Sequence, residues 1–198
     1  MERAISSIDQ ISTKELNYGK LGTWIFLTSE VMLFGALFSS YILLRADAPI
    51  PWKHGWDLFN IPLATLNTAF LITSSVTMVF AYAAIRAGEL PKFKKFLWAT
   101  ILLGCAFLCV KYFEYTGKFH HGIFPSTNLY YAIYFTMTGL HVLHVIGGLI
   151  VNTYFVGPGS KLFQKDPEHF ANRIECAGLY WHFVDVVWIF LFPSIYLL

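Results

Sequence analysis

The sequence has few charged residues. Asp, Glu, Lys and Arg make up 13% of its 198 residues, whereas hydrophobic residues make up 56% and aromatic residues 18%. A soluble domain carries about 25% charged residues, so this composition indicates a protein embedded in lipid. A helix needs roughly 20 residues to cross a bilayer. Several such helices would leave only short loops, which excludes an appended soluble catalytic domain.

The sequence also lacks a basic cluster and a cysteine framework. Its net charge is only +2, whereas nucleic-acid binding needs a concentrated positive surface. The three cysteines, Cys105, Cys109 and Cys176, all lie in apolar stretches. Cys105 and Cys109 have the Cys-x3-Cys spacing of a dinuclear copper site. Without a metal-ligating histidine nearby, we interpret the spacing as helix packing.

The first 20 residues are polar and contain no apolar core, so we expect no cleavable signal peptide. We interpret residues 1–20 as a polar cytoplasmic tail and residues 21–198 as a single transmembrane domain. The first membrane helix of that domain would then serve as the targeting signal.

Five apolar segments predict an all-α membrane protein, a bundle of five transmembrane helices. The expected spans are residues 21–44, 63–85, 96–115, 129–155 and 174–198. The third span is the weakest, because Lys111 and Glu114 interrupt its end. We expect both side chains to snorkel to the headgroup region.

The distribution of basic residues predicts the orientation of the bundle. Ten of them lie in the tail, between the second and third spans, and between the fourth and fifth spans, against four on the other side. The positive-inside rule then puts the N-terminus in the cytoplasm and the C-terminus outside. An aromatic belt is expected at the outer interface, formed by Trp52, Trp56, Tyr112, Tyr115, Tyr130 and Tyr131.

Ionisable residues at membrane depth are informative, because a charge at a helix centre costs at least about 2.5 kcal/mol. Glu30 lies near the middle of the first span and must be protonated, paired or turned into the bundle. His141 and His144 are three residues apart, which predicts that they share one face of the fourth helix.

The fifth span combines a polar and an aromatic stripe. The polar stripe contains Glu175, Gly178, His182 and Asp185. We expect it to face the bundle interior. The apolar stripe contains Trp181, Val184, Trp188 and Phe192. We expect this second stripe to face lipid or a partner.

The buried polar set has two interpretations. Its members are Glu30, Asn67, His141, His144, His182 and Asp185. The histidines could ligate a metal or haem, since imidazole is the commonest such ligand. Alternatively, the set is an interhelical hydrogen-bond network in which each bond contributes roughly 0.6–2 kcal/mol. The network is favoured, because no span contains the Glu-x-x-His spacing of a di-iron site.

Taken together, five segments resemble subunit III of the haem-copper terminal oxidases, the cytochrome c and quinol oxidases. In order, they are Gly22–Phe34 with Glu30 after a serine, Leu66-Asn67-Thr68 with Ser74-Ser75-Val76, Lys111–Tyr115, Gly139–Gly148 with His141 and His144, and Tyr180–Trp188 with His182 and Asp185. The resemblance covers nearly everything from Lys20 to Leu198. Many members of that family have seven helices, and this chain resembles the short five-helix form of bacterial oxidases.

The resemblance implies an accessory subunit, without a redox centre, of a respiratory oxidase that reduces O2 to water with proton pumping. It implies no catalytic, cofactor-binding or metal-ligating residue in this chain, with haem and copper held by partner subunits. The implied partners are catalytic subunit I, subunit II and membrane lipids, in the bacterial cytoplasmic (inner) membrane. By this resemblance Glu30 is expected to contact His144 or its neighbours.

The same resemblance implies that the chain stabilises the catalytic subunit and supports its proton uptake. Four titratable residues in and beside the loop between the fourth and fifth spans are candidates for a proton-collecting surface: Asp166, Glu168, His169 and Glu175.

Two other functions remain open at this point. One is an accessory subunit of a nitric oxide reductase of the same family. The other is a stand-alone proton or ion transporter with Glu30 and Asp185 as carriers, which would normally show broken helices or inverted repeats. Neither feature is visible in the sequence, and the chains that co-purify would distinguish the three functions.

Overall fold

The protein is a bundle of long helices without strands over the residues that its computed structural model describes, 18–46, 61–126 and 128–197. The long helices are α2 (Tyr18–Ala46), α3 (Ile61–Arg86), α4 (Leu90–His120), α5 (Leu129–Val156) and α7 (Pro167–Phe192). The short ones are η2 (Pro158–Lys161), α6 (Leu162–Lys165) and η3 (Pro193–Leu197). Five helices within these described ranges are long and apolar enough to cross a membrane, which confirms the predicted bundle of five transmembrane helices.

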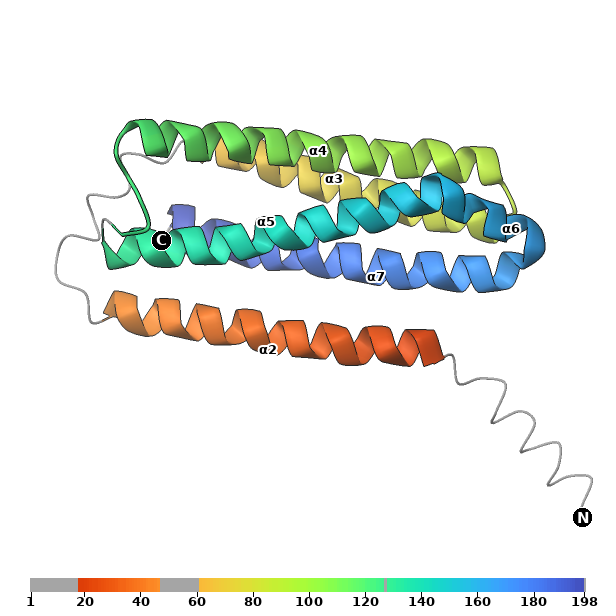
Figure 1. Cartoon of the computed structure of the whole chain (residues 1–198), viewed down its shortest axis with the longest axis horizontal. Coiled ribbons are helices and arrows are strands. Elements are labelled where there is room, and N and C mark those ends of the chain that lie inside the picture. The colour runs from red at the N-terminus through yellow and green to blue at the C-terminus, as the bar shows by residue number, and fades with distance from the viewer. Residues whose placement is uncertain (1–17, 47–60, 127, 198) are drawn as a thin grey trace, which may run out of the picture.

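Helix α7 lies at the centre of the bundle. It packs against α3, α5 and α2, while α4 packs against α3 and α5 (Figure 1). The α3–α4 turn, α6 and the beginning of α2 lie at one end, here called the α6 end. The other end contains the C-terminus and the connection from α4 to α5, and is called the C-terminal end. Residues 1–17, Trp52, Lys53 and Trp56 lie outside the described residues.

Two helices begin six or seven residues before the apolar spans predict. Helix α4 begins at Leu90 and α7 at Pro167, where the sequence suggested residues 96 and 174. A proline in the first turn removes only an N–H that has no partner within the helix, and both helices have one there. Asp166 also caps α7 by accepting a hydrogen bond from the backbone N–H of His169. Charged first turns thus extend helices beyond their apolar segments.

The aromatic stripe of α7 faces the interior, so the expectation that it faces lipid or a partner is wrong. Trp181 and Trp188 are 1% and 0% exposed. Their indole N–H groups donate to the hydroxyls of Ser74 and Thr68 on α3, at 3.0 Å in each case. Because the α3 hydroxyls satisfy the indole N–H groups, these large rings can form the centre of the bundle.

Helix α2 is fastened to the bundle by polar links at three depths. From the α6 end these are Lys20–Glu175, Glu30–His144 and the Tyr41 hydroxyl to the backbone oxygen of Ser194. Aromatic contacts accompany them, including Phe34 with Phe183 at 6.3 Å between ring centroids. Large apolar side chains of α2, among them Trp24, Ile25 and Met32, are exposed at the surface of the bundle.

Candidate functional site

Glu30 and His144 form a pair between α2 and α5. Glu30 Oε2 lies 2.9 Å from His144 Nε2, and each side chain is 14% exposed. The ring of Phe34 packs against the imidazole with 5.3 Å between centroids. Tyr180 on α7 donates a hydrogen bond of 3.0 Å to the backbone oxygen of His144. Three helices therefore meet at this pair.

The hydrogen bonds of His144 limit the charge of the pair. Nδ1 lies 2.8 Å from the backbone oxygen of Leu140. Since a carbonyl oxygen only accepts, Nδ1 carries a proton and donates it to this bond. Nε2 and the Glu30 carboxyl can then share one proton, either as imidazole and carboxylic acid or as imidazolium and carboxylate. Both forms have no net charge, which suits a site at membrane depth.

This geometry predicts different outcomes for two substitutions of Glu30. In Glu30→Gln the amide can still donate to Nε2, so the thermal unfolding temperature in detergent should stay close to that of the unmodified chain. Glu30→Ala leaves a largely buried imidazole nitrogen without its partner, which costs about 1–3 kcal/mol. Its unfolding temperature should fall clearly.

The control for these variants is Ser29→Ala, because Ser29 is exposed and its hydrogen bond among the described residues is to the Phe26 backbone oxygen of its own helix. Equal losses in Glu30→Gln and Glu30→Ala would contradict the pairing.

His141 has surroundings quite different from those of His144. It is fully buried, and neither ring nitrogen has a hydrogen-bond partner among the described residues. Its ring lies 5.6 Å from Phe107 and 5.2 Å from Trp188 between centroids. The two histidines are neighbours on α5 but belong to separate contacts.

The polar residues of α3 and α7 form a third group of contacts. The Ser75 hydroxyl lies 2.6 Å from His182 Nδ1. Asp185 and Asn67 are buried, and their side-chain polar atoms have no hydrogen-bond partner among the described residues. No hydrogen bond within the described ranges joins the Glu30–His144 pair to the Ser75–His182 pair. The six residues expected in one network are thus divided among separate contacts.

A second buried polar group lies at the C-terminal end, and the sequence interpretation missed it. This Glu114 cluster consists of Lys111, Glu114, Lys118, Tyr134 and Tyr196. The Lys111 side chain is only 2% exposed, and that of Glu114 9%. The prediction that both side chains snorkel to the headgroups is therefore wrong.

Glu114 accepts hydrogen bonds from all four other members. The Lys111 ammonium is 2.8 Å from Oε2, the Tyr134 and Tyr196 hydroxyls are 2.8 and 2.6 Å from Oε1, and the Lys118 ammonium is 3.4 Å from Oε1. Lys111 also lies 4.5 Å from the centre of the Trp188 ring, in cation–π geometry. Three helical elements, α4, α5 and η3, are joined here.

The sequence does contain a signal for this cluster. The buried stripe of α4 includes Leu97, Gly104 and Phe107. Lys111 and Lys118 continue the same spacing of three, four and seven residues, so they share the buried face.

The candidate proton-collecting residues lie in two places. Asp166, Glu168 and His169 are exposed at the beginning of α7, where Asp166 is also the helix cap. Glu175 lies further along the helix and is held by Lys20 and by the Tyr82 hydroxyl at 3.2 Å. The structure therefore groups the first three and separates Glu175 from them.

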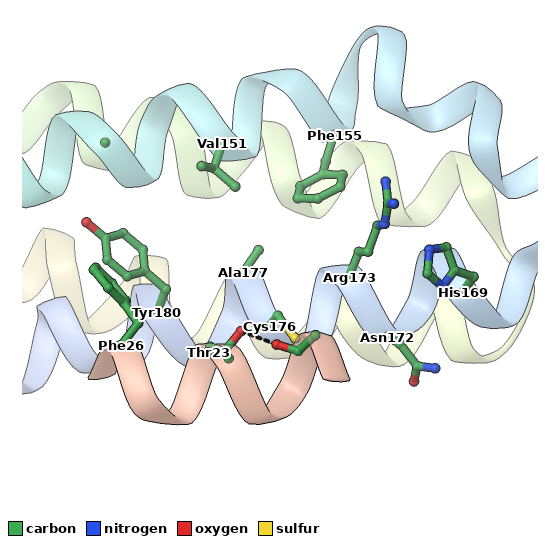
Figure 2. A pocket seen from close by; sticks show the side chains of 13 residues that line it. Thr23, Phe26, Val151, Phe155, His169, Asn172, Arg173, Cys176, Ala177 and Tyr180 are labelled. Atoms are coloured by element: carbon green, nitrogen blue, oxygen red, sulfur yellow. Dashed lines mark hydrogen bonds between the residues drawn. The ribbon is translucent and has the colours of Figure 1, made fainter. Parts of the chain in front are cut away.

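A cavity of about 710 Å³ lies between α2, α5 and α7 (Figure 2). Phe26, Val151 and Phe155 provide apolar walls, and Arg173 and His169 lie toward the α6 end. The cavity is therefore amphipathic along its length.

The structure describes no group of three or more His, Cys, Asp or Glu side chains able to hold a metal ion within its described ranges. Cys105 and Cys109 are free and exposed on α4. Both lie at the surface of the bundle that the structure describes, and the interpretation of their spacing as helix packing stays a prediction.

Comparison with known proteins gives consistent matches along the chain. The profile of the family described as "Cytochrome c oxidase subunit III" matches residues 6–198. The chain is 36% identical over 180 residues to "Probable cytochrome c oxidase subunit 3" of Nocardia farcinica, covering 91% of this chain and 88% of that protein. It is 32% identical over 199 residues to "Probable quinol oxidase subunit 3" of Staphylococcus saprophyticus, covering 100% and 97%. It is 32% identical over 179 residues to "Cytochrome c oxidase subunit 3" of Bacillus sp. strain PS3, covering 90% and 84%.

Proposed function

Because this chain belongs to the cytochrome c oxidase subunit III family and is an accessory subunit of a haem-copper oxidase, we propose that it acts through protein contacts and proton supply and carries no catalytic centre. The observation behind this proposal is that the three buried histidines of the described helices lie in separate contacts. His144 is bonded to Glu30, His182 is bonded to Ser75, and His141 is enclosed by aromatic rings. None of the three is arranged as a member of an open ligand set.

The proposed partners are catalytic subunit I and subunit II of the oxidase, which would hold the haem and copper, with membrane lipids around them. The complex would reduce O2 to water and pump protons across the bacterial inner membrane. The unbroken long helices do not favour the transporter alternative, because transporters commonly use interrupted helices. The named relatives are cytochrome c and quinol oxidase subunits, so either electron donor fits the partner complex.

We further propose that the α6 end faces the cytoplasm. Lys92, Lys95, Lys161 and Lys165 are exposed at this end. At the C-terminal end Lys111 and Lys118 are buried in the Glu114 cluster and do not act as free surface charges. The excess of exposed basic residues at the α6 end supports this orientation by the positive-inside rule.

Removing the chain from the oxidase tests the proposed function. The depleted complex should reduce oxygen at nearly the full rate at first, with slower proton uptake at higher pH, where protons in bulk water are scarce. Its lifetime under turnover should shorten several-fold, because the catalytic subunit loses its support. Oxygen consumption and proton uptake are measured over time and pH.

A triple variant separates the two proposed roles. Asp166→Asn, Glu168→Gln and His169→Gln remove the titratable groups but keep the cap, since Asn caps helices as well as Asp. Proton uptake should slow, while the lifetime of the complex under turnover stays nearly unchanged. The control is Glu89→Gln, because Glu89 is also exposed at the α6 end. Immediate loss of all activity on removal of the chain would indicate a direct catalytic role.

A further inference from the structure

Asp185 is a buried acid whose charge no contact described above balances. It is 4% exposed, and neither carboxyl oxygen has a hydrogen-bond partner among the described residues. No ion pair within the described ranges includes Asp185. A carboxylate at membrane depth without a cation is costly, so the group holds a proton. That proton can exchange with water only along a polar route.

Ser75 and His182 lead from Asp185 toward the outside of the bundle. The Ser75 hydroxyl lies beside the Asp185 carboxyl and 2.6 Å from His182 Nδ1. The other ring nitrogen, Nε2, has no hydrogen bond within the described residues, and His182 lines a hollow between α3 and α7. An imidazole can accept a proton at one nitrogen and donate one from the other, and a hydroxyl rotates to suit its partner. The three side chains therefore form a possible relay.

The hollow extends from His182 toward the α6 end. Its volume is about 200 Å³, with Met78 and Gly178 in its walls and Tyr82 and Glu175 at the end nearer α6. Glu175 precedes His182 by seven residues, or about 10 Å along the helix axis. One water molecule takes up about 30 Å³ in the liquid, so the hollow has room for several. The Tyr82 hydroxyl, the Glu175 carboxylate and His182 Nε2 would be their polar partners.

Charged groups surround the end of the hollow at Glu175. Its Oε1 lies 2.5 Å from Lys20 Nζ, and its Oε2 lies 3.2 Å from the Tyr82 hydroxyl and 4.0 Å from Arg86 Nη2. The side chains of Lys20 and Glu175 are 38% and 23% exposed. Partly exposed charges at the α6 end bring water to the end of the hollow.

We propose that Asp185 is a proton-binding site that exchanges protons with water at the α6 end through the hollow, His182 and Ser75. A proton from water in the hollow binds Nε2, Nδ1 releases one to Ser75 Oγ, and the Ser75 hydroxyl proton moves to the Asp185 carboxylate. Release reverses these transfers. The fully buried Trp188 ring fills the next turn of α7, so the route ends at Asp185 and stores a proton. Because all its groups belong to this chain, the site does not depend on assembly with other subunits.

Hydrogen–deuterium exchange of the Asp185 carboxyl tests this route. The full chain in lipid nanodiscs is moved into D2O, and the infrared C=O band of its protonated carboxyls is followed with time. Asp185→Asn identifies the band that belongs to Asp185. Gly178→Leu puts a side chain into the hollow, and a Cβ there meets Met78 Cε at an ordinary 3.6 Å, so the chain keeps its fold. Exchange should slow at least about tenfold, as about 1.4 kcal/mol of added barrier would give.

The matched control is Gly139→Leu on α5, where an added Cβ meets nothing within 4 Å. Exchange of the Asp185 carboxyl should keep its original rate in this variant, because Gly139 does not line the hollow.

Imidazole rescue separates the relay from a structural role of His182. His182→Ala should slow the exchange, and free imidazole in the medium should restore it, because the ring can enter the hollow. This measurement also covers the case in which Gly178→Leu fails to fold. Three results would overturn the proposal: no protonated Asp185 band in the unmodified chain, exchange unaffected by Gly178→Leu, or exchange in His182→Ala that imidazole does not restore.

Discussion

Replacing Glu114 by alanine should destabilise the chain more than any other single substitution considered for this bundle. Glu114 is the acceptor for Lys111, Lys118, Tyr134 and Tyr196. Its removal leaves the fully enclosed Lys111 ammonium without its carboxylate. Breaking a buried ion pair from one side costs about 3–5 kcal/mol. The unfolding temperature of the purified chain in detergent should therefore drop sharply.

A double variant distinguishes loss of pairing from loss of packing. Lys111→Met combined with Glu114→Leu removes both charges of the closest pair, and apolar replacements of a buried pair are often nearly neutral. The double variant should be more stable than Glu114→Ala. Glu89→Ala, which removes an exposed carboxylate paired with Lys92, serves as the surface control. If Glu114→Ala were no less stable than Glu89→Ala, the cluster would have no structural role.

Gly148→Ala is expected to disturb the centre of the bundle. A Cβ atom at this position would lie 2.7 Å from Cε3 and 2.8 Å from Cζ3 of Trp181. Trp181 cannot move away freely, because its Nε1 donates to Ser74 Oγ and its other ring atoms approach Gly104. Adding one carbon to a filled core typically costs about 1–3 kcal/mol, which a thermal or denaturant unfolding series measures.

The control for this substitution is Gly139→Ala, whose added Cβ meets nothing within 4 Å. It should leave stability unchanged or raise it slightly, since alanine favours helix over glycine. Combining Gly148→Ala with Trp181→Phe should recover part of the loss by shortening the ring. A Gly148→Ala chain as stable as the unmodified one would show that the Trp181 ring is loosely held.

The five helices could be predicted from the sequence because length and apolar composition decide whether a segment spans a bilayer. The orientation of each helix about its own axis could not be predicted as well. In a membrane the outer surface is as apolar as the interior, so hydrophobicity does not separate the two. For this reason Trp181 and Trp188 were expected to face outward, although the α3 hydroxyls that bind them hold both rings inside.

One part of the candidate site could be predicted from the depth of a residue within its membrane span. Glu30 at mid-span requires a partner, and the structure provides His144. The Glu114 cluster was missed because charged residues near the end of a span can also reach water. Their true position depends on Tyr134 and Tyr196, which come from α5 and η3 and are distant in the sequence. The spacing along α4 places Lys111 and Lys118 on the buried face, but it does not identify the tyrosines of α5 and η3 as members of the cluster.

The three polar links of α2 also have a consequence for how the protein is made. Helix α2 emerges from the ribosome first among the described helices, but its partners lie on α5, on α7 and at the beginning of η3. Glu30 and His144 are 114 residues apart, so at ordinary synthesis rates roughly 10 s separate their appearance. During that interval the Glu30 carboxyl lacks its His144 partner. The bundle can close around α2 only when synthesis reaches Ser194, so ribosomes that stall earlier should leave α2 incompletely fastened.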